Sequence, residues 1–288
     1  MKKKVLAAVL AMATAASMMV GCGAGGASDE VYVVSREEGS GTRGAFVELM
    51  GIEQKDENGE KVDYTIDTAE VTSSTSVMMT TVQGNENAIG YISLGSYDEE
   101  KVKALKIDGA EATVENVKNG SYKVSRPFNI AYTDDLSEAG QDFVNFIMSA
   151  QGQEIIEAKG YIKVDENAPA YEGTDVSGKV VVGGSTSVTP VMEKLAESYE
   201  ELNGNVEIEL QTSDSSTGMS ATVDGTLDIG MASRELKDSE KEAGLTGMAI
   251  ALDGIAVIIN KENAADNLTT EQVMKIYTGE ITTWGEME

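Results

Sequence analysis

Short apolar runs alternate with longer segments of helical periodicity along most of the chain. Val31–Val34 and Lys179–Val182 each predict a strand. Each run is followed by apolar residues at helical spacing, over Thr42–Met50 and Val188–Leu202. Strands that alternate with helices in this way predict an α/β fold with mixed or parallel sheets.

The same pattern of apolar and polar positions predicts further elements in the rest of the chain. Residues 250–260 predict a long apolar strand interrupted at Asp253-Gly254, and the polar stretch Asp165–Gly178 lacks apolar periodicity and predicts a linker. Further strands are expected at 87–94, 102–107, within 122–132, 206–210 and 227–234, and further helices through Val82, over 136–156 with a break near Gly152, and over 268–277.

Four turns rich in hydroxyl groups lie at the ends of predicted strands, at Arg36–Thr42, Gly184–Ser187, Asp214–Gly218 and Ala232–Arg234. Ligands of α/β sheets bind beyond the carboxyl ends of strands, where these turns fall. The first N–H groups of a helix lack intrahelical partners, and arginine offers a planar fork of donors. Any one turn is more often an ordinary helix cap. Together with Arg36, the four turns predict a convergent site for a tetrahedral oxyanion.

Composition narrows the function further. The formal net charge of −27 argues against nucleic acid or an anionic membrane surface as a partner. The chain has no histidine, which removes histidine-based hydrolase triads and the commonest metal ligand. We therefore expect no enzyme activity, no cofactor and no metal.

The N-terminus has the pattern of an export signal. A basic segment, Lys2–Lys4, precedes the apolar run Val5–Val20, and Cys22 is the only cysteine. The segment resembles a bacterial lipobox, so residues 1–22 are predicted to be a lipoprotein signal peptide with lipidation at Cys22, and residues 23–29 a tether. The alternative is a plain signal peptide with a chance cysteine. The lipoprotein interpretation places the protein on the extracytoplasmic face of the cell membrane, held by a lipid anchor.

Several long motifs together resemble a known family: SREEGSGTRGAF, GGSTSVTPVMEKLAESYE, DIGMASRELKDSE, ALDGIAVIINKEN, IYTGEITTWGE, NAIGYISLGS and SRPFNIAY. They are similar to the phosphate-binding protein of the Pst-type phosphate ABC transporter, in the lipid-anchored form of Gram-positive bacteria. The resemblance implies a type II periplasmic-binding-protein fold, in which two α/β domains are joined by crossover strands and the ligand lies in the cleft. It also implies capture of inorganic phosphate and its delivery to an ABC permease.

Carried over by matching motif, the resemblance implies a set of phosphate-binding residues: Thr186, Ser187, Ser215, Ser233, Arg36, Ser40, Gly41 and Thr42. Glu38 falls where the family has an acidic residue that orients the arginine. At the position of Ser233, well-studied members have an aspartate that accepts the proton of monohydrogen phosphate and so rejects sulfate. Asp214 and Glu38 are candidate replacements, and we expect phosphate to remain preferred.

The order of the motifs departs from the family, because the half that contains Arg36 comes first. This order resembles a circular permutant whose old termini are joined by residues 165–178. It predicts one domain from 30–123 plus 256–288, a second from 124–255, and crossover strands near Ser125–Tyr132 and Ile250–Asn260. A mis-assembled or truncated gene is the alternative.

Two other functions stay open at the level of sequence. One is a receptor for another tetrahedral oxyanion, such as sulfate or molybdate, or for a phosphorylated solute. The other is a secreted phosphatase, against which the lack of histidine and of a clustered metal-ligand set counts.

Overall fold

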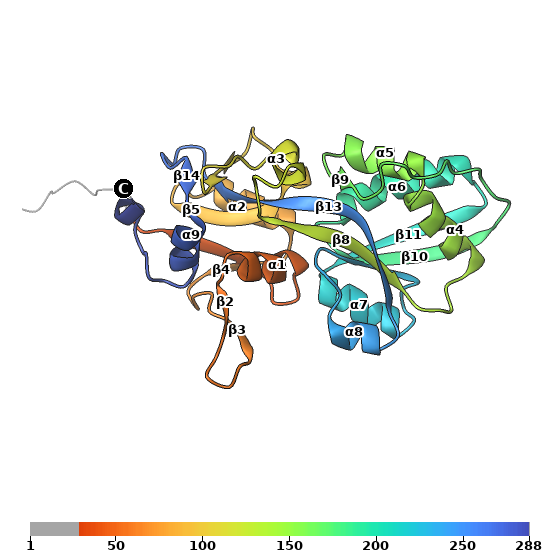
Figure 1. The fold of residues 1–288 in the computed structure, drawn as a ribbon, viewed down its shortest axis with the longest axis horizontal. Helices are drawn as coiled ribbons and strands as arrows, with labels where there is room; N and C mark the ends of the chain where they lie inside the picture. The colour runs from red at the N-terminus through yellow and green to blue at the C-terminus, as the bar shows by residue number, and fades with distance from the viewer. Residues whose placement is uncertain (1–28, 288) are drawn as a thin grey trace, which may run out of the picture.

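The computed structural model describes residues 29–287, and the fold is built around one long curled sheet (Figure 1). The predictions for Cys22, the signal peptide and residues 23–28 of the tether lie outside the described residues. Ten strands belong to this sheet, whose main path runs β11-β10-β12-β8-β13-β5-β1-β4. The sheet is mixed, as the alternation of strands and helices predicted.

The strands are β1 (Tyr32–Arg36), β2 (Glu53–Lys55), β3 (Lys61–Asp63), β4 (Glu70–Thr72), β5 (Ala88–Ser93), β6 (Lys103–Ala104), β7 (Lys106–Ile107), β8 (Ser125–Tyr132), β9 (Ile162–Lys163), β10 (Gly178–Ser185), β11 (Val206–Ser213), β12 (Ile229–Ala232), β13 (Thr246–Ile259) and β14 (Asn267–Leu268). The helices are α1 (Gly41–Leu49), α2 (Thr75–Gln83), α3 (Val114–Lys118), α4 (Glu138–Ile147), α5 (Ala150–Ala158), α6 (Thr189–Leu202), α7 (Ser215–Val223), α8 (Asp238–Glu242) and α9 (Thr270–Tyr277).

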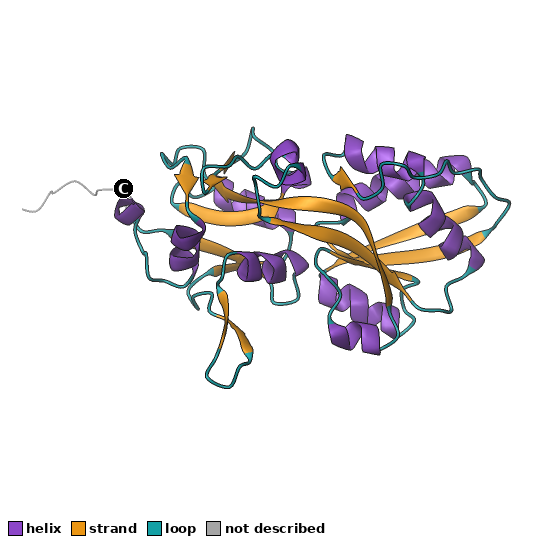
Figure 2. Cartoon of the chain, in the orientation of Figure 1, coloured by secondary structure: helices purple, strands orange, loops and turns teal. Residues whose placement is uncertain are grey.

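Two large apolar cores lie at opposite ends of the sheet, and we call the surrounding structure the first and second lobes. The first core contains apolar residues of β1, β5, α1, α2 and α9, with the C-terminal part of β13. The second core contains those of β8, β10, β12, α4 and α6. Figure 2 shows helices packed on the sheet in both lobes. In each lobe the strands that precede helices lie parallel, β1 with β4 and β5, and β10 with β11 and β12.

Two antiparallel strands, β8 and β13, connect the lobes (Figure 1). β13 pairs with β8 from Thr246 to Gly254 and with β5 from Ile255 to Ile259. The predicted interruption at Asp253-Gly254 is wrong, because the strand runs through it without a break. The buried Asp253 carboxylate forms an ion pair with Arg126 on β8, which offsets the cost of placing a charge inside a sheet.

The predicted break near Gly152 lies a little earlier, between α4 and α5. Ser149 begins the second helix, and its side chain accepts a hydrogen bond from Gly152 N at 3.2 Å. A Cβ atom at Gly152 would lie 2.3 Å from the Phe146 carbonyl oxygen, so glycine permits the close approach of the two helices.

The polar segment 164–177 contains no helix or strand, but it packs against the second lobe. The Pro169 carbonyl accepts a bond from Ala150 N at 2.8 Å, and the Tyr171 hydroxyl donates to Asp142 at 2.5 Å. At the far end of the first lobe, the first and last described segments pair directly, with Val31 N donating to the Thr282 carbonyl at 2.8 Å.

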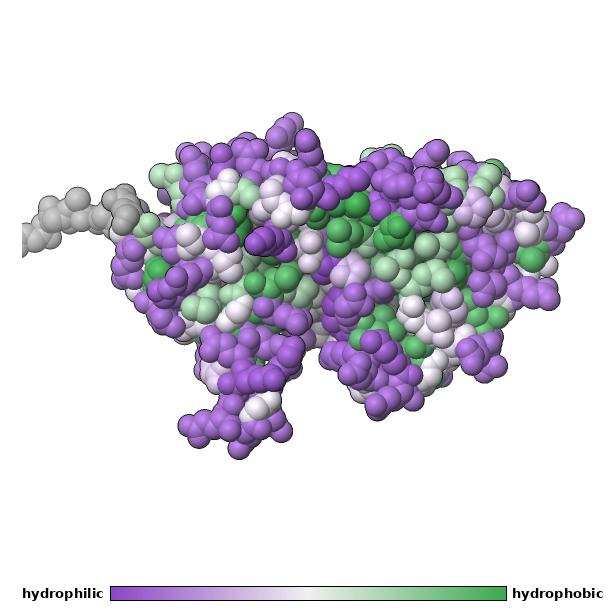
Figure 3. Space-filling model, viewed as in Figure 1, coloured by the Kyte–Doolittle hydropathy of each residue, from purple (hydrophilic) through white to green (hydrophobic). Residues whose placement is uncertain are grey.

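Hydrophilic side chains cover most of the face shown in Figure 3, and hydrophobic ones gather toward its centre. The β2–β3 hairpin extends from the first lobe, and the pair α7 and α8 from the second (Figure 1). Within residues 29–287, none of the helices has the length and apolar character needed to cross a membrane.

Candidate functional site

The N-termini of four helices converge where the two lobes meet. α1 and α2 belong to the first lobe, and α6 and α7 to the second. Three have side-chain caps: Ser40 accepts from Arg43 N, Ser74 from Val77 N and Asp214 from Thr217 N. Because each helix has a partial positive charge at this end, their convergence creates a place suited to an anion.

Arg36 is the last residue of β1, and its side chain is only 2% exposed. Its Nη1 atom donates to Thr75 Oγ1 at 3.4 Å, and its Nη2 atom donates to Thr186 Oγ1 at 3.1 Å. Thr75 begins α2 in the first lobe, whereas Thr186 precedes α6 in the second. One guanidinium therefore contacts hydroxyl groups from both lobes.

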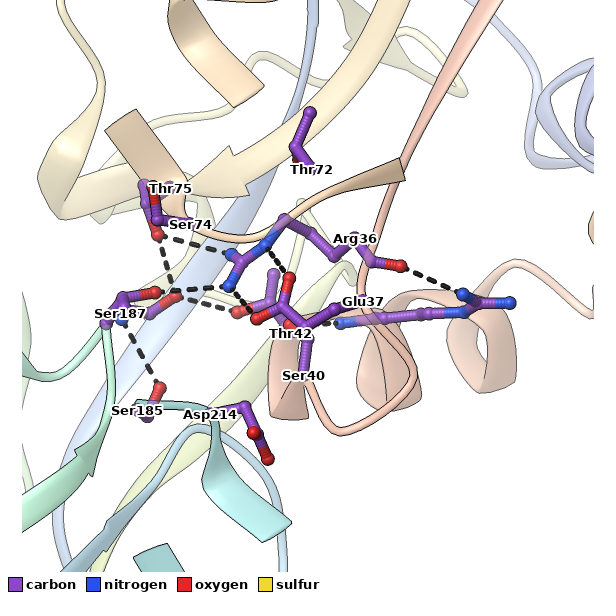
Figure 4. Close-up of polar contacts among 12 residues, drawn as sticks. Arg36, Glu37, Ser40, Thr42, Thr72, Ser74, Thr75, Ser185, Ser187 and Asp214 are labelled. Atoms are coloured by element: carbon purple, nitrogen blue, oxygen red, sulfur yellow. Dashed lines mark hydrogen bonds and ion pairs between the residues drawn. The ribbon is translucent and has the colours of Figure 1, made fainter. Parts of the chain in front are cut away.

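The carboxylate that contacts this guanidinium belongs to Glu37 and not to Glu38. Glu37 accepts from Arg36 Nε at 2.7 Å and from Nη2 at 2.6 Å (Figure 4). Ser40 N donates to the Glu37 carbonyl, which closes a tight turn with Glu38 at its exposed tip. The arginine-orienting contact predicted for Glu38 is thus corrected by one residue.

Seven hydroxyl side chains, which we call the hydroxyl cluster, gather where the two lobes meet: Thr42, Thr75, Ser185, Thr186, Ser187, Ser215 and Ser233. Ser187 Oγ lies 2.8 Å from Thr42 Oγ1 and 3.2 Å from Thr75 Oγ1 (Figure 4). Ser233 Oγ lies 3.3 Å from Thr42 Oγ1 and accepts from Ser185 Oγ at 2.9 Å. Most of these contacts join the first lobe to the second.

The hydroxyl cluster is largely buried, and only Thr186 among its members is partly exposed. Thr42, Ser187, Ser215 and Ser233 are each no more than 1% exposed. Hydrogen bonds between a hydroxyl and an ion are stronger in such a setting than in water.

The other predicted site residues lie at the same place in different roles. Ser215 Oγ accepts from Ser233 N at 3.2 Å. A Cβ atom at Gly41 would lie 2.3 Å from Ser215 Oγ and 2.8 Å from Ser233 Oγ, so only glycine lets α1 approach the second lobe this closely. The Ser40 side chain points to its own helix, where it caps Arg43 N at 3.3 Å.

Asp214, a candidate acceptor, lies at the edge of the site and caps α7. Its two oxygens accept from Thr217 N at 2.9 Å and from Thr217 Oγ1 at 2.6 Å. Partial burial opposes its ionisation, but these hydrogen bonds outweigh that effect and hold the pKa of Asp214 below its usual range. A Cβ atom at Gly39 would lie 2.2 Å from Asp214 Oδ1, so the β1–α1 turn packs directly on this cap.

The position of Arg36 is supported from behind. Its backbone N donates to the Tyr91 hydroxyl at 3.1 Å, and Arg43 Nη1 donates to its carbonyl at 2.9 Å. Burial raises the pKa of Tyr91 to about 12, and its ring stacks on Phe46 with 3.9 Å between centroids. Tyr91 therefore stays protonated, and Arg36 cannot shift without disturbing the core.

Three contributors were missing from the predicted set: Thr75, Ser185 and Glu37. Thr75 follows the hydroxyl-rich run Ser73-Ser74 at the start of the helix that was predicted through Val82, and this helix start was the available signal for it. Ser185 and Glu37 lie inside the predicted turns Gly184–Ser187 and Arg36–Thr42, but neither was among the predicted site residues. Among residues 29–287, no group of three or more histidine, cysteine, aspartate or glutamate side chains could hold a metal ion.

The chain is similar to several known proteins in both sequence and structure. A family model described as a PBP superfamily domain matches residues 1–151 and 169–286. The chain is 51% identical over 293 residues to the phosphate-binding protein PstS 2 of Streptococcus agalactiae, covering 100% of this chain and 99% of that protein. The crystal structure of a phosphate-binding protein of a phosphate ABC transporter from Streptococcus pneumoniae is 46% identical, with a TM-score of 0.72 over 90% of this chain and 100% of that one. The phosphate-binding protein PstS of Pseudomonas aeruginosa is 31% identical over 146 residues, 45% of each protein.

Proposed function

Because the chain belongs to the PstS family of phosphate-binding proteins within the PBP superfamily, we propose that it captures inorganic phosphate for an ABC import permease. The buried Arg36 guanidinium, which contacts hydroxyl groups of both lobes, is the observation that carries this proposal. It supplies a full positive charge at a point where four helix N-termini meet. Phosphate offers four oxygens that can accept from these donors at once.

We propose that the lobes close around the anion by a hinge motion at β8 and β13. The two domains would be residues 30–123 plus 256–288 and residues 124–255, which the two separate apolar cores support. A bound anion would bridge Arg36 and Thr42 on one side to Thr186 and Ser187 on the other. Its contacts with both lobes at once would exist only in the closed form, so binding would shift the population toward closure.

Calorimetric titration of the purified protein with phosphate, arsenate, sulfate and molybdate tests the function. We expect saturable 1:1 binding of phosphate and of arsenate, which has the same shape and charge. A protein that binds none of these anions would refute the proposal. The fluorescence of Trp284 is a poor probe, because its ring lies at the far end of the first lobe, where Nε1 donates to the Asn87 carbonyl.

Selectivity against sulfate needs a proton acceptor at another residue, because Ser233 offers a hydroxyl where a carboxylate would repel sulfate. We propose that phosphate is still preferred and that Glu37 or Asp214 accepts its proton. Both carboxylates lie at the site and have lone pairs beyond those used by Arg36 and Thr217. Equal affinity for sulfate and phosphate at neutral pH would instead support a general receptor for tetrahedral oxyanions.

We propose a receptor and not an enzyme. The hydroxyl cluster lacks a histidine base, and a phosphatase would need an activated nucleophile or a metal-bound water. Release of phosphate from a chromogenic phosphate ester by the purified protein, without added metal, would overturn this part of the proposal.

We further propose that the protein is attached to the extracytoplasmic face of the cell membrane through a lipid on Cys22, where it meets its permease. The sequence at residues 2–22 supports this location. Labelling cells with a palmitate analogue should mark the wild type and not Cys22→Ala. Equal labelling of the two would contradict the anchor.

We propose that the motif order is a natural circular permutation. The relative from S. agalactiae matches in the same order over 293 residues, which supports a natural gene. A colinear match between permuted chains covers only one half of each, as with the 45% covered in the P. aeruginosa protein. Peptides from the natural protein that continue past Glu288 into the strand of residues 31–36 would contradict the permutation.

A further inference from the structure

A second arginine, Arg126, contacts the hydroxyl cluster and was absent from the predicted site residues. Arg126 is on β8, and its side chain is 3% exposed, while that of its ion-pair partner Asp253 is 0% exposed. The guanidinium also donates from Nη1 to the Gly254 carbonyl at 3.0 Å, from Nε to the Ser233 carbonyl at 3.2 Å, and from Nη2 to Thr42 Oγ1 at 3.0 Å. A buried charge with this many partners is held in one orientation.

These partners come from every part of the molecule that must move during closure. Thr42 lies in the first lobe, Ser233 in the second, and Asp253 and Gly254 on crossover strand β13. If the lobes separate, the guanidinium cannot keep both the Thr42 and the Ser233 contacts at their present lengths. Arg126 therefore connects the crossover strands to both halves of the site.

The contact with Thr42 fixes the direction of a proton. A guanidinium has donors and no acceptor, so Thr42 Oγ1 must accept from Arg126. The Thr42 proton is then free to point only to other oxygens. The nearest are Ser187 Oγ at 2.8 Å and Ser233 Oγ at 3.3 Å, both in the hydroxyl cluster. An anion among these groups would accept a hydrogen bond from the Thr42 hydroxyl, which the buried Arg126 cation polarises.

The same geometry helps to explain how so acidic a chain holds an anion. The net charge is −27, yet the hydroxyl cluster has Arg36 on one side and Arg126 on another. Burial lowers the pKa of Arg126, and the Asp253 carboxylate opposes that effect. Arginine stays protonated in proteins, so the second guanidinium keeps its charge, with Asp253 as its counter-ion, and keeps its donors for Thr42.

We propose that Arg126 is a positioning residue for phosphate binding: it orients the Thr42 hydroxyl as a donor to the anion and links both lobes in the closed form, with Asp253 holding it in place. This inference rests on the proposed function. It assigns the Arg126–Asp253 pair a role in affinity beyond its role in stability.

A double-mutant cycle tests the coupling, with phosphate affinity measured by calorimetry and folding checked by thermal unfolding. Arg126→Lys keeps the charge but loses the fork, and Thr42→Val removes the hydroxyl. We expect each change to weaken binding about tenfold, because each removes one hydrogen bond to a charged group or its orientation. In the Arg126→Lys protein, Thr42→Val should cost less than about threefold more, since the hydroxyl is no longer oriented.

Two further variants keep the test decisive. Asp253→Asn disturbs the orientation of Arg126 without touching it, and its cycle with Thr42→Val should show the same coupling if Arg126→Lys does not fold. Arg234→Lys is the matched control, because Arg234 pairs with Glu240 at 2.7 Å and does not reach Thr42. Its cost should simply add to that of Thr42→Val.

The outcomes separate the two proposals. A wild-type protein that does not bind phosphate overturns the proposed function, and this inference with it. A wild type that binds, combined with strictly additive losses for Arg126 and Thr42, leaves the function standing and overturns the positioning role. Loss of thermal stability without any change in affinity would do the same.

Discussion

The two lobes contribute to the site in different ways. The first half-site, made of Arg36, Glu37, Thr42 and Thr75, contains a charged guanidinium held by a carboxylate. The second half-site, made of Ser185, Thr186, Ser187, Ser215 and Ser233, consists of neutral hydroxyl groups. Attraction for charge and completion of the hydrogen-bond shell are therefore divided between the lobes. We expect the anion to bind first to the half-site that has the arginine, and the other half-site to close over it.

The largest difference should come from the charge of the first half-site. Arg36→Ala should weaken phosphate binding by about a hundredfold or more, because two hydrogen bonds to a charged group, each worth about 1.5–3 kcal/mol, are lost. Arg43→Ala should cost less than about tenfold, since Arg43 contacts the Arg36 carbonyl and Asp63 and so acts only through Arg36. Calorimetry on both variants checks this, and equal losses would contradict the site assignment.

The next difference tests how closely the half-sites must approach. Gly41→Ala places a methyl group 2.3 Å from Ser215 Oγ, whereas the methyl group in Gly44→Ala is no closer than 3.9 Å to Arg234 Cδ. Alanine favours the α1 helix by about 1 kcal/mol at the interior position 44, and by less at position 41, which is the first residue of the helix. Overpacking costs about 1–3 kcal/mol, so Gly41→Ala should weaken phosphate binding about twentyfold.

The matched glycine makes that result interpretable. Gly44→Ala should bind phosphate as the wild type does, and both variants should unfold at the wild-type temperature or slightly above it. If Gly41→Ala binds normally, the closed contact between α1 and α7 is not needed for binding.

Features that depend on local sequence were predictable in both half-sites, whereas features that depend on distant residues were not. The starts of α1, α6 and α7 were predictable because cap residues and strand ends are local signals. The continuity of β13 through Asp253 was not predictable, since its compensating partner Arg126 is 127 residues away in the chain. The choice between Glu37 and Glu38 depends on which residue occupies the tip of a tight turn, and two adjacent glutamates leave that undecided in the sequence.

A smaller effect compares one hydroxyl from each half-site. Thr75 and Thr186 both accept from Arg36, at 3.4 and 3.1 Å. Thr186→Val should weaken binding about tenfold, and Thr75→Val about threefold, in line with the longer contact and one neutral hydrogen bond lost. Titration of both variants, with Thr186→Ser and Thr75→Ser as controls that keep the hydroxyl, measures the ratio. A larger loss for Thr75→Val would reverse the assigned importance of the two contacts.

The smallest expected effect concerns acid stability, and it again has one carboxylate beside each half-site. Partial burial opposes ionisation of Asp63 and Asp214, but hydrogen bonds to Thr65 and Thr217, together with Arg43 beside Asp63, lower the pKa of both below the usual range. A depressed folded pKa gives stability that is present above the unfolded pKa of about 4 and is lost as pH falls through the folded value.

Asp214→Asn should cost little at pH 7, because asparagine also caps helices. Asp63→Asn should cost more, since it breaks the Arg43 ion pair. Between about pH 5 and pH 3, both variants should lose less stability in urea denaturation than the wild type does. Slopes against pH that match the wild type would show that neither carboxylate is stabilised in its ionised form by the folded protein.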